Sequence, residues 1–308
     1  MQKDRIHIIG AAILDVLVTP AEPEVFINGS YPADDIRIAF GGDAQNEAFV
    51  LARLGKKVTL NAVVGSDAQG NMIRQRCQEN GIRLVEGKNN SDIRTGVNVV
   101  LVQKNGERNF LTNRNGSLRK LTLEDVQMPF ADDTGIVCFA SIFVFPCITG
   151  KEMAKIFSQA KAQEITVCAD MTKRKGQETI ADLQEALIYV DYLIPNEEEA
   201  CLVTGAVSAE QAAFLLRQAG VKNVIIKCGK RGCYVLAQNA DNGYYVPAQE
   251  AACVDTTGAG DSFAAGLLYG LSEGWELRKC AEFANDCGAK AVGRIGATSW
   301  CEYGRMLE

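Results

Sequence analysis

Short apolar runs alternate along the chain with longer segments whose apolar residues recur at helical spacing. Alternation of this kind predicts a mainly parallel sheet with helices packed against it. The clearest predicted strands span residues 6–9, 58–64, 135–139, 165–170, 192–194 and 224–227. Helices are predicted from residue 44 to a stop at Gly55, and at residues 68–80, 151–162, 209–219, 259–272 and 276–292. The pattern therefore favours an α/β fold.

Two segments depart from this alternation. Residues 97–103 and 107–113 are strand-like runs joined through Lys104-Asn105-Gly106, and an Asn-Gly pair is a strong hairpin signal. Residues 19–40 are interrupted by prolines and fit extended edge strands better than a helix. Both segments are therefore predicted to form β structure outside the main sheet.

These segments are predicted to build a small β lid from two insertions, at about residues 12–40 and 91–116. The sequence contains no internal repeat, low-complexity tract or flexible Gly/Ser linker. The lid should therefore belong to one compact unit, a single domain that spans residues 1–308.

Composition and charge narrow the class of protein. With 308 residues, of which 47% are hydrophobic and 23% charged, the chain can bury a large core. Its net charge is −6 and it has no long block of Lys or Arg, so neither nucleic acid nor a membrane is expected as a partner. No apolar stretch reaches about 18 residues and no clean signal peptide opens the chain, so a cytoplasmic location is expected.

Cysteine usage agrees with that location. The 11 cysteines are scattered without a CxxC pair, and His7 is the only histidine that could join them on a metal. Zinc sites need clustered Cys and His ligands, and disulfide frameworks belong to oxidising compartments. Free thiols in a reducing compartment are therefore the favoured interpretation.

One run of residues carries candidate chemistry. Asp255-Thr256-Thr257-Gly258-Ala259-Gly260-Asp261 joins a short apolar strand to a predicted helix. Gly258, Ala259 and Gly260 would let a polyanion approach the backbone, and the free N–H groups of a first helical turn favour phosphate. Asp261 would then accept a proton from an attacking hydroxyl. Taken alone, an aspartate that caps a helix start is an equally open alternative.

The same run resembles the C-terminal signature of the ribokinase/PfkB carbohydrate kinase family, and further motifs follow the family's order. They are Asp15 after the first strand, Gly41-Gly42-Asp43-Ala44-Gln45-Asn46, Pro195-Asn196-Glu197-Glu198-Glu199, and Lys227-Cys228-Gly229-Lys230-Arg231-Gly232. The resemblance implies a ribokinase-like three-layer sandwich with a mostly parallel central sheet and a small β-sheet lid. It also implies ATP-dependent phosphorylation of a hydroxyl group of a sugar or sugar acid.

The resemblance assigns roles in phosphoryl transfer. Asp261 would be the catalytic base, and the backbone of Gly258, Ala259, Gly260 and Asp261 would form the anion hole. Asn196 and Glu199 would hold Mg²⁺ through water, although a solvated acidic helix start is the alternative. ATP would be bordered by Asn196, Lys227, Gly229, Gly232, Gly258, Gly260 and Asn285.

The acceptor site is implied in the same way by Asp15, Gly41, Gly42, Asp43 and Asn46, which should face the sugar. Asp43 departs from many relatives, which carry Asn or Lys there, and suggests a different hydroxyl pattern or a basic neighbour.

The resemblance to related sugar-acid kinases also implies that Arg114, after the second predicted lid strand, and Lys173, after the strand ending at Asp170, lie against a substrate carboxylate. Arginine suits a planar carboxylate. Surface pairing is the alternative for Arg114. Sugar acid and neutral sugar are left equally open.

Several expectations beyond the reaction also follow from the resemblance. Asp255, Thr257, Ala291 and Gly296 would hold a monovalent cation such as K⁺, with ordinary helix packing and a C-terminal turn as the alternative. A homodimer through the lid is expected. A nucleoside kinase and a catalytically silent sugar-binding regulator remain rival functions. A dinucleotide-binding oxidoreductase is the weakest rival, because the chain has neither a GxGxxG fingerprint nor a GxxxxGK[ST] loop.

Overall fold

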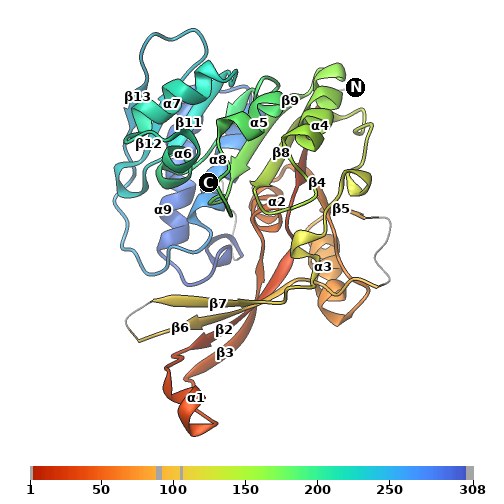
Figure 1. Ribbon diagram of the computed structural model, residues 1–308, viewed down its shortest axis with the longest axis vertical. Coiled ribbons are helices and arrows are strands. Elements are labelled where there is room, and N and C mark those ends of the chain that lie inside the picture. The colour runs from red at the N-terminus through yellow and green to blue at the C-terminus, as the bar shows by residue number, and fades with distance from the viewer. Residues whose placement is uncertain (1–2, 88–91, 105–106, 303–308) are drawn as a thin grey trace.

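The structure is a computed structural model that describes residues 3–87, 92–104 and 107–302 (Figure 1). Its strands are β1 (Arg5–Ile9), β2 (Ile13–Thr19), β3 (Asp35–Gly41), β4 (Lys57–Ala62), β5 (Arg83–Glu86), β6 (Val97–Val102), β7 (Arg108–Thr112), β8 (Thr134–Ile142), β9 (Thr166–Met171), β10 (Tyr192–Leu193), β11 (Asn223–Lys227), β12 (Cys233–Leu236) and β13 (Tyr244–Val246).

Its α-helices are α1 (Glu24–Asn28), α2 (Asp43–Arg53), α3 (Ala68–Glu79), α4 (Gly150–Ala162), α5 (Ile180–Leu187), α6 (Glu197–Thr204), α7 (Ala209–Gln218), α8 (Ala259–Ser272) and α9 (Leu277–Val292). Short 3₁₀ turns, η1 to η4, lie at Ser117–Arg119, Leu123–Asp125, Gly229–Arg231 and Ser299–Cys301. Every predicted strand and helix is present, with ends shifted by a few residues at most.

Within the described part of the chain, nine strands form the main sheet in the order β13-β12-β11-β10-β9-β8-β1-β4-β5. Pairing is parallel from β11 to β5, and only β12 and β13 run antiparallel at one edge. The mostly parallel central sheet is thus confirmed. Parallel strands place their carboxyl ends at one edge, where ligands bind in open α/β sheets.

Two helical layers cover the sheet, because successive side chains of a strand point to opposite faces. Ile9, Val137 and Val167 pack with α4, α5, α6 and α7, whereas Ile8 and Ile136 pack with α2 and α3. Helices α8 and α9 extend this second layer towards β11 and β12. Figure 1 shows α4 to α7 in front of the sheet and α2, α8 and α9 behind it.

A second sheet, of order β3-β2-β6-β7 in the described residues, projects from the main body (Figure 1). Its strands come from the two segments that the sequence singled out. The expectation that residues 19–40 are extended is wrong in part, because the short helix α1 lies inside them. Asn105 and Gly106, expected at the hairpin turn, and residue 91 lie outside the described residues.

Strand alternation gives the small sheet two unlike faces. Its inner face carries Asp15 on β2, Asn98 on β6 and Arg108 on β7, as the register shows. Its outer face carries apolar side chains, of which Ile36 is 66% exposed and Ile38 is 58% exposed. The inner face, which also carries the 59% exposed Phe110, is the one that faces the site described below.

Two further predictions concern the whole chain. All 11 cysteines are free, and most of them are buried. In the part of the chain that the structure describes, no single helix is long and apolar enough to cross a membrane. Among these residues, only α6 and α7 taken together, with a bend of 55° between them, reach the length and apolar composition of a membrane span.

Candidate active site

Two cavities lie at the carboxyl-terminal edge of the main sheet. The larger, of about 820 Å³, contains Lys227 at the end of β11, and the smaller, of about 320 Å³, contains Thr172 just after β9. Residues 256–261 form the wall between them. Thr257, Gly258 and Asp261 line the smaller cavity, whereas Thr256, Ala259 and Gly260 line the larger one.

Asp261 lies in the first turn of α8 and touches the other signature of the chain. Its Oδ2 accepts a hydrogen bond of 2.7 Å from Asn46 Nδ2 on α2. Burial and the negative charge of Asp43 raise the pKa of Asp261 to about 8, although the Asn46 hydrogen bond and Lys227 act in the opposite direction. A carboxylate that titrates near neutral pH is well matched to accept a proton.

The turn before α8 depends on glycine at position 258. Gly258 has a φ of 72°, and a Cβ atom there would lie 2.5 Å from Ala297 Cα. Glycine adopts this left-handed conformation without steric cost. The backbone N–H groups of the first turn of α8 therefore remain at the cavity wall, where the helix dipole favours an anion.

The Gly41-Gly42 pair brings the start of α2 against the loop between β1 and β2. Gly42 has a φ of 93°, and a Cβ atom there would lie 2.5 Å from the carbonyl oxygen of Ala11. A Cβ atom at Gly41 would lie 2.3 Å from Asp15 Oδ2, so Gly41 leaves room for that carboxylate. Gly42 itself lines the smaller cavity.

Asp15, Asp43 and Asn46 also line the smaller cavity, as expected. Asp15 Oδ1 accepts a hydrogen bond of 3.1 Å from Asn98 Nδ2, and Asn98 Oδ1 accepts one of 2.8 Å from Thr112 Oγ1. These two hydrogen bonds link β2, β6 and β7 across the inner face of the small sheet. Burial raises the pKa of Asp15, and the Asn98 hydrogen bond opposes that rise.

Asp43 and Glu47 lie on the same face of α2. Ser141 Oγ donates to Asp43 Oδ2 at 3.3 Å. Burial raises the pKa of Asp43, while Lys227 and Lys175 oppose the rise, so these lysines are the basic neighbours that an aspartate at this position suggested. Glu47 is fully buried, and burial with the charge of Asp170 raises its pKa well above the usual range.

Lys227 lines the larger cavity, and its charge also acts on Asp43 and Asp261 of the smaller one. Its Nζ donates to Asp170 Oδ2 at 2.5 Å, and a Cβ atom at Gly260 would lie 3.6 Å from that Nζ. Burial alone would lower the pKa of Lys227, but Asp170 and Glu199 outweigh burial and raise it. The ammonium group is therefore charged beside the turn that precedes α8.

Of the other residues expected at a nucleotide, Gly229, Gly232, Gly260 and Asn285 line the larger cavity. Gly258 lines the smaller cavity, and Asn196 lines neither. Asn285 Nδ2 donates to the carbonyl oxygens of Val246 at 3.0 Å and Pro247 at 3.2 Å. Its amide therefore fixes the strand end that closes one side of the cavity.

Asn196 and Glu199, the expected Mg²⁺ residues, cap α6 reciprocally. Glu199 N donates to Asn196 Oδ1 at 2.9 Å, and Asn196 N donates to Glu199 Oε2 at 2.8 Å. Among the described residues, no group of three or more His, Cys, Asp and Glu could hold a metal. Magnesium keeps several waters and uses few protein carboxylates. Asn196 and Glu199 line neither cavity, so any contact between them and Mg²⁺ would have to run through water.

Three of the residues expected at a monovalent cation, Asp255, Thr257 and Gly296, are brought together, but a basic side chain joins them. Asp255 Oδ1 accepts a hydrogen bond of 2.8 Å from Thr257 N, and Asp255 Oδ2 accepts one of 2.9 Å from Gly296 N. Arg108 of the small sheet forms an ion pair with Asp255 and donates to Thr257 Oγ1. The carbonyl oxygen of Ala291 accepts the hydrogen bond of Arg294 N at 3.2 Å.

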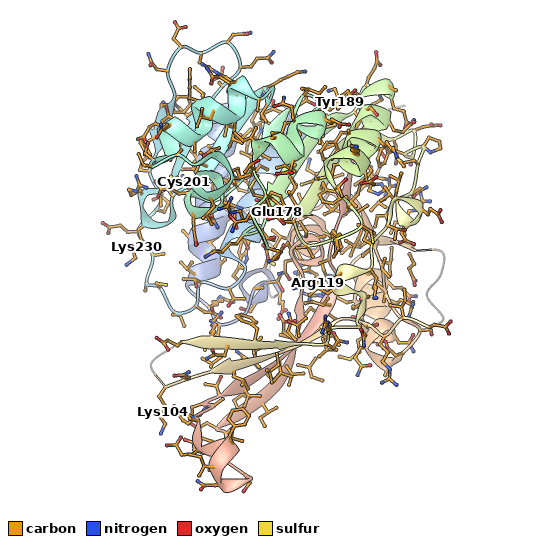
Figure 2. All side chains as sticks on the ribbon, in the orientation of Figure 1. Lys104, Arg119, Glu178, Tyr189, Cys201 and Lys230 are labelled. Atoms are coloured by element: carbon orange, nitrogen blue, oxygen red, sulfur yellow. The ribbon has the colours of Figure 1, made fainter. Side chains whose placement is uncertain are left out.

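The two residues expected against a substrate carboxylate are not at the cavity. Arg114 is exposed and is absent from the lining, and Lys173 forms an exposed ion pair with Glu198. Arg119 in η1 and Lys175 after β9 line the smaller cavity instead. Figure 2 shows Arg119 where the small sheet meets the main body.

Comparison with known proteins shows the family to which the chain belongs. The model of the pfkB carbohydrate kinase family matches residues 3–302. The chain belongs to this family. This pfkB-family kinase is therefore a phosphotransferase with an alcohol group as acceptor, as expected.

Two curated relatives of this kinase share 28% identity with it. Mouse ribokinase aligns over 285 residues, which is 88% of this chain and 83% of that protein. Aminoimidazole riboside kinase of Salmonella typhimurium aligns over 271 residues, which is 83% of this chain and 83% of that protein. Arabidopsis thaliana ribokinase, solved with ribose and ATP, has a TM-score of 0.78 at 24% identity and covers 99% of this chain and 100% of its own. That likeness supports the ribokinase-like fold.

Several residues of this kinase site were not found from its sequence. Asn98 and Arg108 lie inside predicted lid strands, where period-two alternation could have placed them on one face with Asp15. Glu47 follows Asp43 by one helical turn, so helical spacing could have placed both carboxylates on the same face of α2. Nothing in the sequence favoured Arg119 over Arg114 or Lys175 over Lys173, because loop paths decide which of them enters the cavity.

Proposed function

We propose that the protein transfers the γ-phosphoryl group of ATP to a hydroxyl of a sugar or sugar acid, with Asp261 as the catalytic base. One observation carries this proposal. The wall between the two cavities is the turn that begins α8, with Asp261 on the side of the smaller cavity and Gly260 on the side of the larger. A phosphoryl group passing between the cavities would meet this turn.

The residues at the wall suit an in-line transfer. Asp261, with a pKa of about 8, would take the proton of the acceptor hydroxyl. The backbone N–H groups of Gly258, Ala259, Gly260 and Asp261 would form the anion hole, and Lys227 would add positive charge beside it. Retention of this machinery favours an active kinase over a silent sugar-binding regulator.

The nucleotide would occupy the larger cavity, beside Lys227, Gly229, Gly232 and Asn285. Asn196 and Glu199 would hold Mg²⁺ through water. When bound, Mg²⁺ neutralises phosphate charge that develops during transfer.

The acceptor is inferred to carry an anionic group. Arg119 and Lys175 line the smaller cavity together with the carboxylates of Asp15 and Asp43, which suit hydroxyl groups. Two cationic side chains at one cavity favour a sugar acid over a neutral sugar or a nucleoside. The segments Gly10–Asp15 and Thr112–Leu118 also resemble the bacterial sugar kinase YdjH, and this likeness agrees with a sugar-type acceptor.

The small sheet is proposed to act as the lid of the site, since its inner face carries Asp15 and Asn98 at the smaller cavity. Its apolar outer face is proposed to pair with a second copy of the chain. In sedimentation velocity, the wild type is expected to sediment as a dimer and an Ile36→Lys, Ile38→Lys double variant as a monomer. A monomeric wild type at micromolar concentration would contradict the dimer.

The reaction is tested by an ADP-release screen over neutral sugars, sugar acids, phosphorylated sugars and nucleosides. The best acceptor is expected among sugar acids, and Asp261→Asn is expected to lower kcat about 10²–10⁴-fold on it. Nucleotide binding by calorimetry should survive in that variant, which separates loss of the base from loss of the fold. Turnover of Asp261→Asn at the wild-type rate would refute the assignment of the base.

A further inference from the structure

Asp255 is a buried carboxylate held from four sides. Its side chain is 2% exposed, and it accepts hydrogen bonds from Thr257 N, Thr257 Oγ1 and Gly296 N at 2.8, 2.7 and 2.9 Å. The fourth partner is the guanidinium group of Arg108. Burial would raise the pKa of Asp255, but the bonds from Gly296, Thr257 and Arg108 together lower it. Asp255 is therefore ionised in the fold.

A buried carboxylate of this kind needs a positive charge nearby, because an unpaired buried charge is costly. Arg108 supplies that charge, with one nitrogen on Asp255 and another on Thr257. These are two of the residues expected to hold a monovalent cation. The residues present therefore do not fit the expected cation.

Arg108 reaches this position from a different part of the molecule. It begins β7, on the inner face of the small sheet, 147 residues from Asp255 in the sequence. Its target lies on the loop that leads directly into Gly258 and α8, and Thr257 of that loop lines the acceptor cavity. The ion pair thus joins the small sheet to the turn between the two cavities.

We propose that Arg108 replaces the monovalent cation, so that a guanidinium group delivered by the small sheet neutralises Asp255 and fixes the turn before α8 when the sheet closes. The inference rests on the proposed function for the role of that turn. Arg108 acts as a positioning residue, since it contacts the loop and not the reacting atoms. The kinase is accordingly independent of K⁺, and closure of the small sheet and completion of the anion-binding turn are one event.

The test compares wild type with Arg108→Ala and Arg108→Lys. Arg37→Ala is the matched control, because Arg37 belongs to the same small sheet and pairs at 3.6 Å with the exposed Asp35. ADP release is measured at constant ionic strength in potassium, ammonium, sodium and choline chlorides, at saturating and limiting ATP. Binding of Tl⁺, a K⁺ probe, is followed by ²⁰⁵Tl NMR, and thermal midpoints are measured in each salt without substrates.

Wild type and Arg37→Ala are expected to keep the same rate in all four salts and to leave Tl⁺ unbound. Arg108→Ala is expected to lose about tenfold in kcat in choline chloride and to recover most of that loss in potassium or ammonium chloride. The same variant should bind Tl⁺ and gain thermal stability in K⁺. Arg108→Lys retains a positive charge and should behave like wild type.

Three results would overturn the proposal. They are a wild type that needs K⁺ or binds Tl⁺ at this loop, an Arg108→Ala variant with an unchanged rate in choline chloride, and a loss in that variant that no cation restores. Thallium binding and thermal midpoints need neither acceptor nor ATP. They decide the role of Arg108 even if no acceptor is phosphorylated, which would instead count against the proposed function.

Discussion

Removal of the hydrogen bond between Asn46 and Asp261 should shift the pH dependence of catalysis in a defined direction. The Asn46 amide donates to Asp261 at 2.7 Å and stabilises the ionised carboxylate. A hydrogen bond to a charged group contributes about 1.5–3 kcal/mol. If about 1.4 kcal/mol of this favours the ionised over the protonated form, Asn46→Ala raises the pKa of Asp261 by about one pH unit.

The sign follows from the state that the reaction needs. A general base works when deprotonated, so kcat/KM should rise with pH through the pKa of Asp261, which is about 8 in the wild type. In Asn46→Ala the rising limb should move to higher pH. At pH 7 the variant is then expected to have about tenfold lower kcat/KM, and the gap should narrow above the new pKa.

The assay is ADP release at limiting acceptor and saturating ATP, in overlapping buffers of constant ionic strength. Asn46 also lines the acceptor cavity, so lost substrate contacts would lower kcat/KM by a constant factor at every pH. The pKa of Asp261 is therefore read from the pH at which kcat/KM rises, and not from the maximum value that kcat/KM reaches. A limb that stays in place or moves to lower pH would refute the reasoning.

Three other predictions follow from the same site. Asp261→Asn should raise the thermal midpoint at pH 9 and leave it nearly unchanged at pH 3, since the raised pKa of Asp261 makes its ionised form unfavourable in the fold; an equal change at both pH values would contradict this. Gly258→Ala should destabilise the protein by about 2 kcal/mol in urea unfolding and abolish ADP release, because φ is 72° there and Ala297 leaves no room for a Cβ atom; wild-type stability would refute it. Arg119→Ala should raise KM about tenfold for a sugar acid but not for its neutral analogue, whereas Arg114→Ala should change neither; equal losses on both acceptors would remove the carboxylate from the proposal.

Much of the fold was predictable because its signals are local. Apolar runs and helical spacing predicted the central strands of the main sheet and most of the helices that cover it, although β5, α5 and α6 were missed. The Asn-Gly pair pointed to β6 and β7. The short helix α1 was missed, since five residues carry no helical period. The antiparallel edge strands β12 and β13 were not predicted, because runs of four and three residues give no pattern.

The candidate site was predicted unevenly, and distance along the chain explains why. Asp261, Gly258 and Gly42 sit in turns whose geometry their own residue types dictate. Arg114 and Lys173 were chosen by their position after predicted strands, and both face solvent. Lys173 and Lys175 both follow β9 in a loop, where no strand period fixes the direction of a side chain, so only the path of the loop brings Lys175 to the cavity.

The sequence by itself determined the turn before α8, because small residues, a left-handed glycine and an aspartate in the first helical turn are requirements of the local backbone. It also determined that the inner and outer faces of the small sheet differ, since alternation is a property of each strand. Only the tertiary structure decided what these elements meet. It placed Asn46 against Asp261, Lys227 beside Gly260 and Arg108 on Asp255, because contacts between distant segments depend on how the two sheets pack and not on any local pattern.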